Sequence, residues 1–269
     1  MNESQDMNSG YTYSGSPEEE ANRLAKQAQS FGDQDLPILR RFGLQPGQNV
    51  LDAGCGAGTV TVEIAKEISP AQVIGIDRDE GLLTQARHHA AQLRITNVEF
   101  IQQDITAPNL PEARFDFVYC RFVLWAISKR QKALHNMIKL AKPQGIVCAQ
   151  EADADSRIYW PPLPAHERYW HGRIKYHQDR QDGIDPAFGK KLYALFVQAK
   201  LVNIKIGVSA LYKEHFTWDR DADIHIGSGA DALRAGYITQ EDLMEIAEWA
   251  KDPFAFIMFS TVIVAGSKS

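Results

Sequence analysis

The sequence contains few cysteines and has no spacing suited to zinc. Its three cysteines, Cys55, Cys120 and Cys148, lie far apart among apolar residues in a chain of 269 residues. An odd number of widely spaced cysteines indicates reduced, buried thiols rather than a disulfide framework. We therefore expect a cytoplasmic protein without a structural metal.

Long apolar runs and a surplus of basic residues are also missing. No stretch approaches the roughly 18 apolar residues of a membrane span, and the polar, acidic first residues do not resemble a signal peptide. The net charge of -5 and the pI of about 5.9 give no electrostatic reason to expect nucleic acid as a partner. With 44% hydrophobic and 23% charged residues, the composition is that of a soluble globular protein, which we expect to be a monomer or homodimer.

The most informative stretch runs from residue 49 to residue 58 and reads NVLDAGCGAG. The apolar run that ends at Leu51 predicts a buried strand, and residues 59–68 have the apolar spacing of a helix. Three glycines lie between them at alternate positions: Gly54, Gly56 and Gly58. A turn of this kind lets a ligand approach the backbone and directs helix N–H groups toward it.

The glycine spacing separates two classes of ligand. A dinucleotide site requires G-x-G-x-x-G, whereas this turn reads G-x-G-x-G and has Thr59 where the third glycine would stand. Asp52, two residues before the first glycine, would repel a pyrophosphate in a site of low dielectric. A cationic ligand without phosphate fits better, and an oxidoreductase that uses NAD remains the less favoured alternative.

The pattern [V/I]-L-D-x-G-C-G-x-G resembles motif I of the class I S-adenosylmethionine (SAM)-dependent methyltransferases. Residues 115–125 resemble motif IV of the same family, FDxVxxxxxLxx. The overall layout is similar to that of ubiquinone/menaquinone-type small-molecule methyltransferases. This resemblance implies SAM as cofactor, S-adenosylhomocysteine as product, and methyl transfer to an oxygen, nitrogen or carbon atom of a small metabolite. A SAM-binding protein without methyl transfer is a second alternative.

Strand and helix patterns alternate through the first half of the chain. Strands are predicted at 49–53, 72–77, 97–102, 115–120 and 145–151, and helices at about 59–68, 79–93 and 128–141. This alternation predicts βαβ units and a parallel sheet with helices on both faces. Residues 202–211 and 254–266 add two alternating strands. The resemblance implies an α/β, Rossmann-like methyltransferase fold with a seven-stranded, mostly parallel sheet and an antiparallel last strand.

Three carboxylates, Asp52, Asp77 and Asp104, stand at the ends of neighbouring predicted strands. Such a negative rim suits a sulfonium with an ammonium tail. The resemblance implies that Asp77 accepts hydrogen bonds from ribose hydroxyls and that Asp104 meets the adenine amino group. The alternatives are a solvent-facing Asp77 and a helix-capping Asp104.

The resemblance places four further residues at the cofactor. They are Ala53 and Arg78 beside the turn and the ribose site, Ile105 with its backbone at an adenine ring nitrogen, and Arg121 at the end of the fourth strand. Arg121 could pair with the carboxylate of the ligand or lie on the surface.

Residues 1–44 are expected to form an N-terminal helical lid. Ser16 as N-cap, Pro17 at the first helical position and Glu19 as partner in a capping box predict a helix start. Tyr13, just before this helix, is the residue we expect to place an aromatic ring against the sulfonium.

Regular periodicity weakens after the fifth predicted strand. We expect residues 45–269 to form the methyltransferase domain, with insertions at about 152–184 and 214–252 that cap the substrate or form a dimer interface. Displacement of a methyl group from a cation requires mainly positioning and desolvation, so the absence of a catalytic motif is consistent with this chemistry. Candidates for a general base are Glu151, His166, Tyr169, His171 and His177, although a histidine in an aromatic-rich cap is more often structural.

Overall fold

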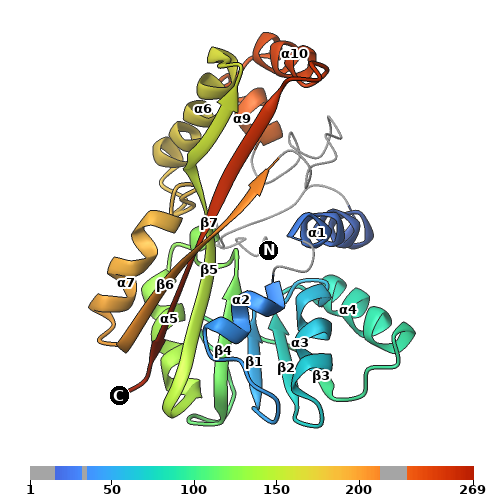
Figure 1. Ribbon diagram of the computed structural model, residues 1–269, viewed down its shortest axis with the longest axis vertical. Coiled ribbons are helices and arrows are strands. Elements are labelled where there is room, and N and C mark those ends of the chain that lie inside the picture. The colour runs from blue at the N-terminus through green and yellow to red at the C-terminus, as the bar shows by residue number, and fades with distance from the viewer. Residues whose placement is uncertain (1–15, 32–34, 213–228) are drawn as a thin grey trace, which may run out of the picture.

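The computed structural model describes residues 16–31, 35–212 and 229–269 (Figure 1). A seven-stranded sheet has the order β3-β2-β1-β4-β5-β7-β6. Its strands are β1 (Val50–Ala53), β2 (Val73–Asp77), β3 (Val98–Gln102), β4 (Phe115–Arg121), β5 (Ala141–Trp160), β6 (Val202–Tyr212) and β7 (Phe256–Ser267). The first five are parallel, and β7 runs antiparallel to both β5 and β6. This is the predicted mixed sheet.

Helices cover both faces of the sheet, as predicted. They are α1 (Pro17–Phe31), α2 (Asp35–Arg41), α3 (Thr59–Ile68), α4 (Glu80–Gln92), α5 (Arg130–Leu140), α6 (Pro164–Arg180), α7 (Leu192–Gln198), α9 (Gly229–Arg234) and α10 (Gln240–Trp249), with short 3-10 turns η2 (Leu124–Ala126) and η3 (Gly189–Lys191). Apolar residues of α2 and α3 pack on one face, and those of α5 and α7 pack on the other. None of the helices in the described ranges is long and apolar enough to cross a membrane.

Local capping explains why two of these helices begin where they do. The Ser16 N–H donates to the Glu19 carboxylate at 2.7 Å, and the Glu19 N–H donates to the Ser16 hydroxyl at 3.2 Å. Thr239 and Asp242 form the same reciprocal pair at the start of α10. The predicted capping box of α1 is therefore confirmed, and each pair satisfies N–H groups that the helix itself leaves without a partner.

β5 is much longer than the predicted strand at 145–151. It pairs with β4 only as far as Gln150 and then continues to Trp160 along β7. A break in register between Asp153 and Ile158 interrupts the alternation of apolar and polar residues, which is why the sequence pattern is weak there. Residues 151–160 of β5 form an overhang beyond its pairing with β4. Since β5 is parallel to β1, this overhang extends past the carboxyl-terminal end of β1.

The overhang of β5 carries a small second core. Tyr169 and Tyr176 of α6 pack against Ala232 of α9 and against Ile238 and Leu243 at the start of α10. The Arg168 guanidinium donates to the Asp242 carboxylate at 2.6 Å. Helix α6 from the first predicted insertion and helices α9 and α10 from the second therefore lie together, beside the end of β5 and the start of β7 (Figure 1). Helix α6 was not anticipated, because it buries polar and charged side chains as well as apolar ones.

Candidate functional site

The glycine turn lies between β1 and α3, as the sequence predicts. Gly54, Gly56 and Gly58 have φ angles of 80°, 53° and 73°, in the left-handed region that favours glycine. The N–H groups of Gly54 and Cys55 donate to the Ile76 carbonyl at 2.7 and 3.0 Å, which fastens the turn to β2. The turn therefore stands at the end of β1, where the strand order changes direction between β1 and β4.

The three glycines of the turn differ in how closely their neighbours approach. A Cβ atom on Gly54 would lie 2.4 Å from a methyl group of Val123, and one on Gly58 would lie 2.7 Å from the Cβ of Ala86. A Cβ atom on Gly56 would meet only the end of the Leu24 side chain, at 3.1 Å. Packing alone thus accounts for Gly54 and Gly58, whereas Gly56 is the position where the backbone is most open to a ligand.

Helix α1 lies over this turn. Leu24 of α1 is the side chain nearest to the open side of Gly56, and Pro17, at the start of α1, comes within 2.6 Å of where a Cβ atom on Gly81 would be. Both contacts place α1 across the upper ends of α3 and α4 (Figure 1). The lid stays a prediction, and its Tyr13 lies outside the described residues.

Asp52 supports the turn from inside. Its carboxylate accepts the Thr61 hydroxyl at 2.7 Å and is only 4% exposed. Ala53, which ends β1, is fully buried. No side chain caps the start of α3, which leaves the first N–H groups of this helix without a side-chain partner.

Asp77 links the end of β2 to the glycine turn. Its carboxylate accepts N–H groups from Gly56 at 2.9 Å and from Asp79 at 3.0 Å. Burial raises the pKa of Asp77, and these two backbone hydrogen bonds partly offset the rise. An ionised carboxylate offers about four acceptor sites, so Asp77 retains capacity for ligand hydroxyls.

The other predicted adenosine contacts lie at the ends of β2 and β3. Asp104 is exposed and accepts the Thr106 N–H at 2.7 Å, which makes it a turn residue rather than a helix cap. Ile105 is buried, and its carbonyl accepts the side-chain amide of Asn136. Arg78 is exposed. Asp52 lies within β1, Asp77 ends β2 and Asp104 follows β3, so the three aspartates are at or near the ends of adjacent strands.

The loop after β4 forms the opposite wall of the turn. Arg121 ends β4, and its guanidinium lies 5.5 Å from the centre of the Phe122 ring. Phe122 has a φ angle of 57°, a strained conformation for a bulky residue and one often found at functional sites. This left-handed conformation reverses the chain direction, so that the Val123 side chain packs against Gly54. The sequence pattern gives no sign of this reversal.

Glu151 holds this loop in place. Its carboxylate is fully buried and accepts the N–H groups of Val123, Leu124 and Trp125 at 3.2, 2.8 and 3.4 Å. Burial raises the pKa of Glu151 to about 8, although the backbone N–H groups act in the opposite direction. The side chain proposed from sequence as a general base is therefore placed as a support for the loop.

The remaining candidates belong to the region around α6. His166 is buried between Tyr159, stacked at 3.8 Å, and Trp249, at 4.8 Å edge to face, and burial lowers its pKa to about 4. His177 is buried against Asp182, Tyr169 is buried beside Trp170, and His171 is exposed. Within the described ranges, no group of three or more His, Cys, Asp or Glu side chains is placed to hold a metal ion.

Comparison with known proteins identifies the class to which this fold and turn belong. The methyltransferase domain family matches residues 44–200, more than half of the chain, and the chain belongs to this family. Its strand order and structural neighbours are those of the Rossmann-like class I fold. The YcgJ protein from Bacillus subtilis superposes with a TM-score of 0.61 at 17% identity, over 90% of this chain and 98% of that one.

Two curated relatives are similar in sequence. An uncharacterized methyltransferase of Schizosaccharomyces pombe is 31% identical over 60% of this chain and 59% of its own length. The ubiquinone biosynthesis O-methyltransferase of Coxiella burnetii is 35% identical over 37% of this chain and 41% of its own length. The chain thus spans roughly two fifths to three fifths of the relatives it matches.

Proposed function

We propose that this protein binds SAM at the glycine turn and transfers its methyl group to an oxygen, nitrogen or carbon atom of a small metabolite. One observation carries the proposal. Three left-handed glycines lie between β1 and an uncapped helix, and the Asp77 carboxylate is fixed to the most open of them, Gly56. This arrangement exposes backbone at the strand ends and gives a ribose an acceptor at a set distance from it.

The residues around the turn fit SAM better than a dinucleotide. A carboxylate at Asp52 lies beneath the turn, and a second one at Asp77 lies beside it, so a pyrophosphate would meet two negative groups. The absence of a third glycine in the dinucleotide spacing points the same way, since Thr59 begins α3 directly. These features argue against the NAD alternative.

Bound SAM supplies a methyl group on a positively charged sulfur. The residues of the chain orient and enclose the reacting groups: the loop from Phe122 to Trp125 forms one wall, and α1 covers the turn. Positioning and exclusion of water suffice for displacement by a good nucleophile. A base for a poorer nucleophile remains a proposal, and the neutral imidazoles of His166 and His177 are the buried candidates.

Parallel calorimetric titrations with SAM, S-adenosylhomocysteine and NAD test the donor site. Micromolar binding of the first two and none of NAD is expected, followed by release of S-adenosylhomocysteine when a panel of small alcohols, phenols and amines is added. Binding of NAD alone would overturn the proposal. Binding of SAM with no turnover across the panel would favour the alternative of a SAM-binding protein without methyl transfer.

A further inference from the structure

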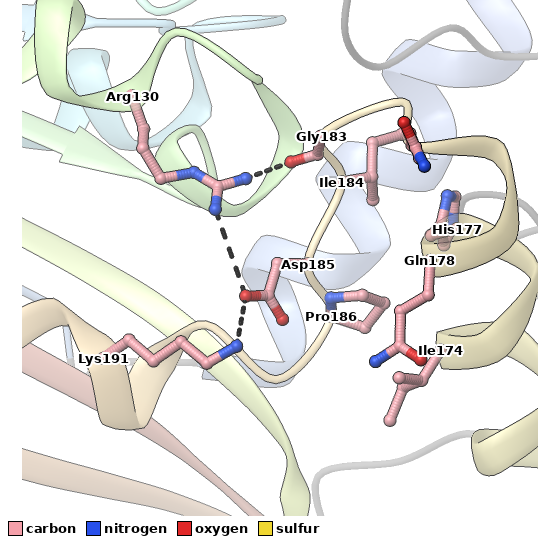
Figure 2. Close-up of a pocket in the computed structure, with 10 residues that line it drawn as sticks. Arg130, Ile174, His177, Gln178, Gly183, Ile184, Asp185, Pro186 and Lys191 are labelled. Carbon is pink, nitrogen blue, oxygen red and sulfur yellow. Dashed lines mark hydrogen bonds and ion pairs between the residues drawn. The ribbon is translucent and has the colours of Figure 1, made fainter.

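A pocket separate from the glycine turn lies between α6 and the segment that leads into α7. Its volume is about 280 Å³. Figure 2 shows Arg130 and Lys191 reaching toward Asp185 on one side, with side chains of α6 on the other. The lining residues are Arg130, Ile174, His177, Gln178, Gln181, Gly183, Ile184, Asp185, Pro186 and Lys191.

Arg130 is built rigidly into the wall of this pocket. Its Nε donates to the carbonyls of Leu124 and Ile127, each at 3.1 Å, and a terminal nitrogen donates to the Gly183 carbonyl. Another terminal nitrogen lies 4.0 Å from the Asp185 carboxylate. The guanidinium is thus fixed by the backbone and presents its charge to the pocket.

Lys191 is the adjustable cation. Its ammonium lies 2.6 Å from the Asp185 carboxylate, and its side chain is 54% exposed. A lysine on a flexible stem can leave one carboxylate for another at little cost, which the anchored Arg130 cannot do. The ammonium could therefore turn toward an incoming anion.

The lining has an excess of positive charge. Two cations, Arg130 and Lys191, face the single carboxylate of Asp185. His177, whose Nδ1 lies 2.9 Å from Asp182 outside the lining, has a pKa lowered by burial and is neutral at pH 7. The remaining side chains divide into the amides of Gln178 and Gln181 and an apolar group, Ile174, Ile184 and Pro186.

The volume of the pocket limits the size of its ligand, and its walls connect it to the loop after β4. Ligand pockets for drug-sized molecules start near about 300 Å³, so this one suits a small ligand with one ring or a short chain. The Asp185 N–H donates to the Trp125 carbonyl at 2.8 Å, and Leu124 contacts Arg130. The pocket therefore shares a wall with the loop that rests on the glycine turn.

We propose that this pocket binds a small organic acid, with its carboxylate between Lys191 and Arg130 and its apolar part against Ile174 and Pro186. The acid has two possible sources: it is the methyl acceptor itself, or a separate effector bound beside the acceptor site. The acceptor assignment rests on the proposed methyl transfer, whereas the binding of the acid does not.

Ligand-observed NMR with benzoate and with benzamide, its uncharged counterpart, tests the binding. Benzoate should bind and benzamide should bind at least about tenfold more weakly, as expected for the loss of a charge-assisted hydrogen bond. Equal binding of the two probes, or binding of neither, would overturn the proposal. Because this readout needs no turnover, its failure is distinct from failure of SAM binding or of S-adenosylhomocysteine release.

Three variants locate the binding at this pocket. Lys191→Gln should weaken benzoate binding about tenfold. The matched control is Lys190→Gln, since the neighbouring Lys190 pairs with Asp155 and does not line the pocket. Asp185→Asn removes the competing carboxylate and can keep the hydrogen bond from the Ala187 N–H, so it should tighten benzoate binding severalfold. Misfolding cannot produce such a gain, and unchanged affinity in both Lys191→Gln and Asp185→Asn would refute the site.

Turnover assays separate the two sources of the acid. Release of S-adenosylhomocysteine with hydroxy- or amino-substituted benzoates, reduced by Lys191→Gln through a higher KM and an unchanged kcat, would identify the acid as the acceptor. Binding of benzoate that changes turnover of an uncharged acceptor would identify an effector. Both results support the acid site, which the NMR titration alone can overturn.

Discussion

The Glu151 carboxylate accepts the backbone N–H of Leu124 at 2.8 Å, inside a region that water does not reach. The bond joins β5 to the loop after β4, whose next residue upstream, Val123, rests on Gly54. A single buried acid thus sets the position of one wall of the glycine turn.

Replacement of Glu151 by Gln should flatten the pH dependence of stability. The folded-state pKa of about 8 lies above the ordinary value of 4.5, so the folded chain keeps a proton that the unfolded chain releases. The stabilising contribution is complete below pH 4.5 and is lost as the pH rises to about 8. Between pH 4.5 and pH 8, the free energy of unfolding of the wild type, measured in urea, should fall by a few kcal/mol more than that of Glu151→Gln. If the stabilities of the two proteins changed with pH in parallel, the raised pKa of Glu151 would be contradicted.

Glu151→Ala provides the contrast to the Gln variant. Alanine leaves the buried N–H of Leu124 and the partly buried N–H groups of Val123 and Trp125 without their acceptor, at a cost of up to about 1–3 kcal/mol each if no water replaces it. We expect this variant to lose SAM affinity at least about tenfold, whereas Glu151→Gln, which retains an acceptor oxygen, should stay close to wild type. Calorimetry on both folded variants makes the comparison.

Gly56→Val should abolish SAM binding while the fold persists. The new side chain would occupy the open side of the turn, where its Cβ atom would meet only the end of the Leu24 side chain. Gly47→Val is the matched control, because Gly47 has a similar left-handed φ of 85° with nothing within 4 Å of the position of its Cβ. The two variants should lose about 1–2 kcal/mol each from backbone strain, and only the first should lose the cofactor. Normal SAM binding by Gly56→Val would mean that the turn is not the donor site.

Leu24→Ala should loosen the cover over the turn. Leu24 is the α1 side chain that comes nearest to Gly56, so its truncation should raise the SAM dissociation constant severalfold with little change in melting temperature. Asn22→Ala, on the exposed side of the same helix, serves as control. Stopped-flow release of S-adenosylhomocysteine should be faster in the first variant alone, and identical release rates would exclude a role of α1 as a lid.

His166→Phe should remove a loss of stability in acid. The pKa of His166 falls from 6.5 to about 4 because burial, and secondarily Arg157, disfavour the charged ring. The stabilisation of the neutral folded form is therefore complete above pH 6.5 and is lost as the pH falls toward 4. Phenylalanine preserves the stack with Tyr159 but does not titrate. Unfolding curves at pH 7 and 4.5 should differ less for the variant than for wild type; an equal difference would show that His166 does not titrate in the cap.

Local signals allowed the turn and the strand ends to be predicted from sequence. Gly54, Gly56 and Gly58 follow an apolar run directly, so short-range spacing is enough to place them. The contacts that enclose the turn join residues far apart in the chain, such as Leu24 with Gly56 and Glu151 with Leu124. No spacing rule connects such pairs, and they become visible only when the sheet order is known.

The overhang of β5 was missed for a different reason. Asp153, Asp155 and Arg157 place charged residues in it, and the break in register between Asp153 and Ile158 shifts which residues share a face. Charged residues are tolerated there because they have partners: the Asp153 carboxylate accepts the Lys190 N–H at 2.9 Å, and the Arg157 guanidinium lies 3.3 Å from the centre of the Trp170 ring. The spacing of apolar residues in the sequence registers the charged residues but carries no information about their partners, which are distant in the chain.

The same overhang separates two parts of the chain that can be substituted independently of each other. The residues that support the glycine turn extend along β5 as far as Glu151, whereas α6, α9 and α10 have their own core, which includes Tyr169 and Leu243. Substitutions in that outer core should leave the contacts of the glycine turn unchanged. We therefore expect the sequences of this protein's relatives to vary more beyond residue 151 than in the strands and the glycine turn before it.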